Sequence, residues 1–62
     1  MRIGAWRRPA EIETAHKVAK FSTVDDSVFQ SACGEWFYIE GARMATPYDR
    51  CQRCELIEVV LL

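Results

Sequence analysis

The sequence predicts a small, metal-stapled α+β domain that is rich in β-hairpins and ends in a short helix. The chain has only 62 residues. At that length a protein buries ~60% of the surface that its unfolded chain exposes, so the core alone gives marginal stability. Three cysteines and one histidine are available to bind a metal that would add stability. We expect one metal-binding domain over residues 1–62, in which residues 1–10 could form a flexible basic arm.

The composition indicates a compact globule with no strong preference for nucleic acid. Half of the residues are hydrophobic and 27% are charged, which argues against disorder. The net charge of −1 lacks the basic excess that nucleic-acid-binding proteins usually carry. Basic residues nevertheless gather near the amino end and around the last two cysteines, so a local basic face remains possible. They are Arg2, Arg7, Arg8, Arg43, Arg50 and Arg53.

Targeting signals are not visible in the sequence. No apolar run of signal-peptide length follows the first arginines, and the final run, "LIEVVLL", is interrupted by Glu58 and is too short to span a bilayer. We therefore expect a cytoplasmic protein whose thiols stay reduced. A thioredoxin-like use of the CxxC pair would need a larger βαβ domain than this length allows.

The segment from residue 10 to residue 21 is ambiguous. Its alanines, glutamates and lysines favour a helix, Pro9 suits a first helical position, and Glu13 and Lys17 have i,i+4 spacing. A strand would place Ala19 and Phe21 on the face opposite His16 and Val18, which makes the alternation imperfect. Propensity alone favours the helix.

Two strands are predicted in the middle of the chain, at residues 27–32 and 35–40, because both are rich in aromatic and β-branched residues. Gly34 between them permits a tight turn or a bulge. Residues 41–48 predict a turn and a short extended piece in which Pro47 limits pairing.

The carboxyl end predicts a helix. Asp49 and Gln52 have the spacing of a capping box. Apolar residues then recur on one helical face, at Leu56, Ile57, Val60 and Leu61. The segment "IEVVLL" is also β-prone, so a strand is the alternative there.

The cysteines and the histidine together match a structural zinc site. Zinc prefers four thiolate or imidazole ligands in a tetrahedron, and the two residues inside Cys51-x-x-Cys54 let both sulfurs reach one ion. Cys33 and His16 complete a Cys3His set with no ligand left over. Alternatively, His16 is an ordinary surface or core residue and Cys33 a small buried apolar residue. We expect one Zn²⁺ per chain rather than an iron–sulfur cluster, which usually needs four thiolates.

The spacing of these residues resembles that of small zinc-binding proteins from actinobacteria and their bacteriophages, which share a His, a later "CG" and a closing "CxRC". In this chain the matching elements are His16, "SACG" at 31–34 and "RCQRC" at 50–54. The resemblance implies a zinc-ribbon or treble-clef-like unit with His16 on an early strand.

An enzymatic role is not expected. A catalytic zinc keeps an open position for water and needs a general base nearby. The H-x-E and P-C-x-x-C patterns of zinc deaminases are absent, since Val18 lies two residues after His16 and Arg50 precedes Cys51.

The favoured function is a protein-interaction module, which could be a phage-encoded modulator of a host protein. The chain has more apolar surface than a domain of this size can easily bury, and apolar surface that stays exposed marks interfaces. The candidate interface residues are Trp6, Trp36, Leu61 and Leu62.

Two other functions remain open. One is a nucleic-acid-binding zinc finger that uses Arg7, Arg8, Arg43, Arg50 and Arg53 on phosphates. The other is a homo-oligomeric or virion structural component. A membrane or a small-molecule substrate is not expected.

Overall fold

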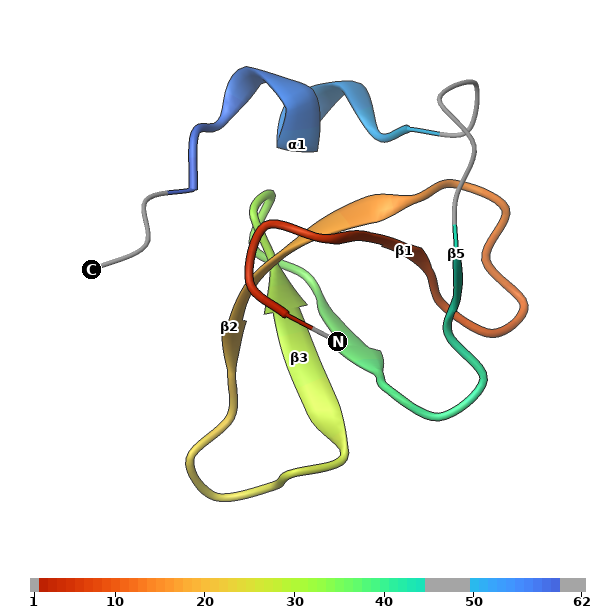
Figure 1. Cartoon of the computed structure of the whole chain (residues 1–62), viewed down its shortest axis with the longest axis vertical. Coiled ribbons are helices and arrows are strands. Elements are labelled where there is room, and N and C mark those ends of the chain that lie inside the picture. Colours follow the sequence, from red (N-terminus) through yellow and green to blue (C-terminus); the bar gives the residue numbers. More distant parts are fainter. Residues whose placement is uncertain (1, 45–49, 60–62) are drawn as a thin grey trace.

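A curled antiparallel sheet with one short helix makes up the protein. The computed structural model describes residues 2–44 and 50–59. The strands are β1 (Trp6–Arg8), β2 (His16–Phe21), β3 (Val28–Ser31), β4 (Trp36–Tyr38) and β5 (Arg43–Met44), and the helix is α1 (Gln52–Leu56). The strand order is β4-β3-β2-β1-β5, with antiparallel pairing throughout. Figure 1 shows α1 across one end of this sheet, where it packs against β2. The predicted α+β class is therefore confirmed.

The β3–β4 hairpin forms where the sequence predicts two strands. Its turn is closed by the Ser31 amide, which donates to the Glu35 carbonyl at 2.8 Å, and by the Gly34 amide, which donates to the Ser31 carbonyl at 3.0 Å. Gly34 has φ +98°, a conformation that side-chain-bearing residues rarely adopt. The hairpin turn therefore depends on glycine and places Cys33 at its tip.

The segment that propensity assigns to a helix is the strand β2. Its pairing with β3 shifts register between Val18 and Lys20, which marks a β-bulge at this point. Beyond the bulge, Phe21 pairs with Phe29, which puts Phe21 on the same face as Val18. The imperfect alternation of apolar residues in the sequence is thus explained by the bulge. Burial in the sheet overrides the helical propensity of Ala, Glu and Lys.

The amino-terminal segment enters the sheet. Trp6–Arg8, which the sequence allows to be part of a flexible arm, form β1 and pair with β2 on one side and β5 on the other. The predicted extended piece after Gly41 is present as β5. Residues 6–8 are therefore held by long-range pairing that no local pattern reveals.

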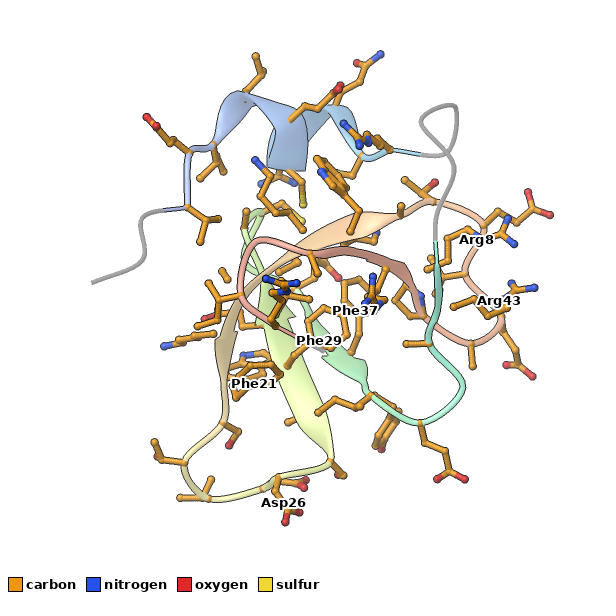
Figure 2. The ribbon with its side chains drawn as sticks, viewed as in Figure 1. Arg8, Phe21, Asp26, Phe29, Phe37 and Arg43 are labelled. Atoms are coloured by element: carbon orange, nitrogen blue, oxygen red, sulfur yellow. The ribbon has the colours of Figure 1, made fainter. Side chains whose placement is uncertain are left out.

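The core is small. Of the described residues, the buried hydrophobic ones are Ala15, Val18, Phe29 and Cys54. The Phe29 and Phe37 rings lie 5.8 Å apart, and Figure 2 shows both over the sheet with Phe21 nearby. Such a core contributes little of the stability that a folded domain needs.

The helix α1 is shorter than the apolar pattern predicts. Cys51 is its N-cap and makes no side-chain capping hydrogen bond, while the expected cap Asp49 lies outside the described residues. Ile57 is already extended, at φ −106° and ψ 120°, so the predicted helical face does not continue past Leu56. Residues 60–62 also lie outside the described part of the chain. Within the described residues, no helix is long and apolar enough to cross a membrane.

Candidate metal centre

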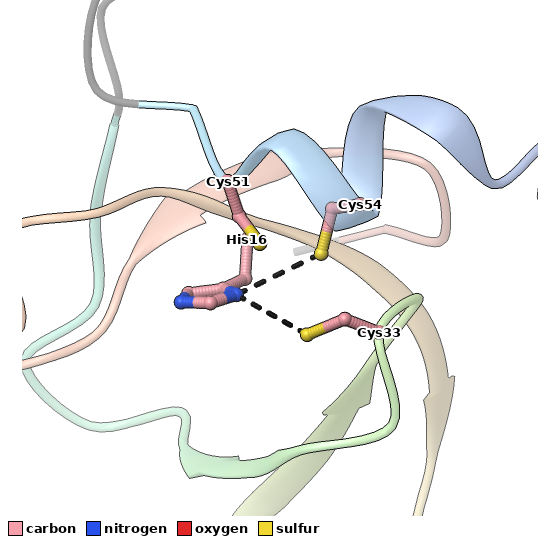
Figure 3. A group of neighbouring side chains, drawn as sticks. All are labelled: His16, Cys33, Cys51 and Cys54. Carbon is pink, nitrogen blue, oxygen red and sulfur yellow. Dashed lines mark hydrogen bonds between the residues drawn. The ribbon is translucent and has the colours of Figure 1, made fainter.

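The four predicted ligands meet at one point between the sheet and α1. The Nδ1 of His16 lies 3.6 Å from the Sγ of Cys33 and 3.7 Å from the Sγ of Cys54, and Figure 3 shows these two approaches. With Cys51 included, the four ligand atoms all lie within 4.8 Å of one another. All three cysteines are free thiols. The cluster is therefore compatible with a single structural metal ion.

Three separate elements bring these side chains together. His16 opens β2, Cys33 occupies the β3–β4 turn, and the CxxC pair begins α1. A bridge between Ala15 and Arg50 joins the start of the helix to the start of β2, and the Cys51 amide donates to the Ala15 carbonyl at 2.8 Å. Because Ala15 immediately precedes His16, this pairing carries the CxxC segment to the imidazole.

The surroundings of His16 favour its neutral, ligating form. Burial lowers the pKa of the imidazole, and the nearby Glu35 carboxylate offsets this only in part. The ring also stacks on Phe37, with centroids 4.5 Å apart and an interplanar angle of 33°. Since Nδ1 faces the sulfurs, the ring proton belongs on Nε2 when a metal is bound.

The Cys33 and Cys54 thiols cannot both ionise easily without a cation. Burial raises the pKa of Cys54, and the adjacent Cys33 sulfur raises it further despite hydrogen bonds from two backbone amides. Burial also raises the pKa of Cys33, but hydrogen bonds from the Ser31 hydroxyl and the Glu35 amide outweigh it, so Cys33 ionises below the ordinary thiol pKa. Ionisation of Cys33 is thus favoured over that of an ordinary thiol, while ionisation of Cys54 is opposed by burial and by the like charge of Cys33. A divalent cation removes that conflict.

Two further residues support the ligands and were not singled out from the sequence. The Ser31 hydroxyl lies 3.0 Å from the Cys33 sulfur and is 2% exposed. The Phe37 ring supports His16. Neither residue type is specific to metal sites, so no sequence signal would have found them.

The five candidate arginines do not form one continuous face. Arg7 donates to the Trp6 carbonyl at 2.9 Å and is half-buried. Arg8 pairs with Arg43 across β1 and β5, and Figure 2 shows both at the same edge of the sheet. The Arg50 guanidinium lies 4.6 Å from the Trp6 ring centroid and 4.0 Å from Glu55. Arg43 and Arg53 are exposed.

The candidate interface residues lie in different environments. Trp36 is 49% exposed, as an interface anchor requires. Trp6 is half-buried and packs against cations of its own chain. Leu61 and Leu62 lie outside the described residues.

Comparisons with protein-family models, with curated proteins and with solved structures find no match to this chain.

Trp6 connects the two ends of α1 to the sheet. The Lys17 ammonium lies 5.3 Å from the Trp6 ring centroid and donates to the Ile57 carbonyl at 2.9 Å, just beyond the helix. Arg50, just before the helix, packs on the same ring. Trp6, Lys17 and Arg50 therefore form a clamp that holds the CxxC helix over His16.

We expect Trp6→Leu to destabilise the metal-loaded protein by about 1–2 kcal/mol, because two cation–π contacts and part of the buried ring area are lost. Chemical denaturation of the metal-loaded chain measures this change. Trp36→Leu is the matched control, since that ring is half exposed and has one cation, Lys20, at 5.8 Å. An equal loss in both variants would contradict the clamp.

Proposed function

We propose that this chain is a non-enzymatic structural-zinc mini-domain that acts as a protein-interaction module. The observation that carries the proposal is the convergence of one imidazole and three thiols on a single point. With bonds of ~2.3 Å to sulfur and ~2.0–2.1 Å to nitrogen, the S···N edge of a zinc tetrahedron is ~3.6 Å. The two S···N distances at the cluster are 3.6 and 3.7 Å. A set of three soft thiolates and one imidazole binds Zn²⁺ in preference to hard cations, which prefer oxygen ligands.

A structural role for the metal agrees with the number of ligands. Four protein ligands complete the tetrahedron, whereas a catalytic zinc keeps one position for water or substrate. His16 and Cys54 are buried, which keeps solvent away from half of the ligand set. These features support a site that stabilises the fold rather than one that performs chemistry.

We also infer a treble-clef-like fold and a bacteriophage setting for this domain. One ligand pair starts a helix and the others come from a strand and a hairpin turn, which supports a treble-clef-like rather than a zinc-ribbon arrangement. The resemblance to small zinc-binding proteins of actinobacteria and their phages supports a phage-encoded modulator of a host protein. Reduced thiols require a compartment such as the cytoplasm.

Exposed apolar side chains support the interaction role. Trp36 and Tyr38 on β4 are 49% and 70% exposed, and Leu56 and Ile57 at the end of α1 are 87% and 41% exposed. Aromatic residues are frequent anchors at protein interfaces. A nucleic-acid-binding zinc finger is the alternative, with Arg43 and Arg53 as its exposed cations. The protein-interaction role is favoured because Arg7 is engaged by the Trp6 main-chain carbonyl and Arg50 packs on the Trp6 ring.

Native mass spectrometry of the chain purified under reducing conditions tests the proposal. We expect one zinc per wild-type chain, and loss of bound zinc in Cys54→Ser, because a neutral hydroxyl replaces a buried thiolate ligand. Ser31→Ala is the control: it removes a group that contacts Cys33 but is not a ligand, and should retain one zinc. A wild-type chain without metal would refute the zinc site.

A further inference from the structure

The free edge of β4 is short, but it carries no charged residue, proline or bulge that would protect it from pairing. In the described part of the chain, β4 pairs with β3 alone. Edge strands are normally kept from pairing by very short length, charged residues, proline or bulges. The opposite edge, β5, is two residues long and includes Arg43. In contrast, β4 is Trp36–Tyr38, three aromatic residues without a charge.

Trp36 and Tyr38 present both main-chain groups and aromatic rings at this edge. The Ser31 amide donates to the Glu35 carbonyl, and the Ile39 amide donates to the Ser27 carbonyl. Because backbone groups of successive strand residues point to opposite sides, residues 35, 37 and 39 face β3. The N–H and C=O groups of Trp36 and Tyr38 therefore point away from β3, and the two residues are exposed.

We propose that β4 pairs antiparallel with β4 of a second copy, around a two-fold axis at Phe37. This proposal rests on the proposed function, a protein-interaction module, and names its partner. In this register Trp36 of each copy lies opposite Tyr38 of the other. Each such pair exchanges two main-chain hydrogen bonds, because both residues direct their backbone groups toward the partner strand.

The charged residues that flank β4 are compatible with this self-pairing. With the axis at Phe37, Glu35 lies opposite Ile39 of the other copy, and Glu40 lies opposite Gly34. No like charges face each other, and the two Trp–Tyr cross-strand pairs are of the kind that stabilises antiparallel sheets. In a two-fold dimer both copies contribute the same surface patch. The partner of the β4 edge is then β4 of the other copy.

Sedimentation velocity of the zinc-loaded chain, from ~10 µM to ~1 mM, tests the dimer, since pairing through so short an edge gives a weak complex. We expect a concentration-dependent dimer and increasing protection of the Trp36 and Tyr38 amides from hydrogen exchange. Tyr38→Lys places charges at the edge and should weaken dimerisation at least ~10-fold. Val24→Lys is the matched control, because Val24 is 95% exposed in the loop before β3; it should leave dimerisation unchanged.

Three results would overturn the proposal. One is a monomer at every concentration. Another is a dimer that Tyr38→Lys leaves intact, which would place the interface elsewhere. The third is protection of the two amides only when a different protein is added, which would make the edge a site for a foreign strand. Zinc content measured on the same samples separates these results from failure of the metal site, because a zinc-loaded monomer contradicts the dimer alone.

Discussion

Removal of zinc is expected to unfold the chain. Structural zinc supplies ~10–16 kcal/mol of apparent folding free energy in small peptides, more than a core of this size can replace. The metal would also join α1, which contacts the sheet mainly at β2, to His16 and to the β3–β4 turn. Circular dichroism and amide chemical-shift dispersion, measured before and after a strong chelator, should show loss of the sheet and of fixed packing.

Readdition of metal provides the control for this experiment. Zn²⁺ should restore the folded spectrum, whereas Mg²⁺ should not, because it prefers oxygen ligands in octahedral geometry. A chelated chain that keeps its dispersion and its sheet signal would show that the fold does not depend on the cluster. The stability would then have to come from packing or from association between copies.

Truncation of Phe29 is expected to be the most damaging change outside the metal cluster. Phe29 is fully buried, pairs with Phe21 on one neighbouring strand, and contacts the Phe37 ring on the other. A Phe→Ala change in a core typically costs ~3–5 kcal/mol through lost burial and the cavity left behind. Because Phe37 also stacks on His16, the cavity should loosen the support of the imidazole.

Thermal denaturation of the zinc-loaded variant measures this effect. For a domain of this size each kcal/mol shifts Tm by ~4–8 °C, so Phe29→Ala should lower Tm by more than ~10 °C. Val24→Ala, which truncates a side chain that is 95% exposed, should change Tm only slightly. Equal shifts in the two variants would mean that Phe29 does not hold the sheet together.

The residues of the candidate metal cluster were predictable because their chemistry is independent of the fold. His16 and the three cysteines are the only residues of their types in the chain, so counting ligand-type residues was enough to select them. The β3–β4 hairpin was predictable for a local reason, since aromatic and β-branched runs flank a glycine that the turn requires.

The sequence by itself therefore determined the candidate ligand set, the central hairpin and the need for added stability in so short a chain. The resemblance implied a strand at His16, against the helical propensity. Only the tertiary structure decided that this strand runs over residues 16–21, that β1 joins the sheet and that Trp6 packs against Lys17 and Arg50. The physical reason is the range of the interactions. Propensity and ligand chemistry act within a residue or a turn, whereas strand pairing, the bulge in β2 and the Trp6 clamp depend on partners far apart in the chain, which override a local preference for helix.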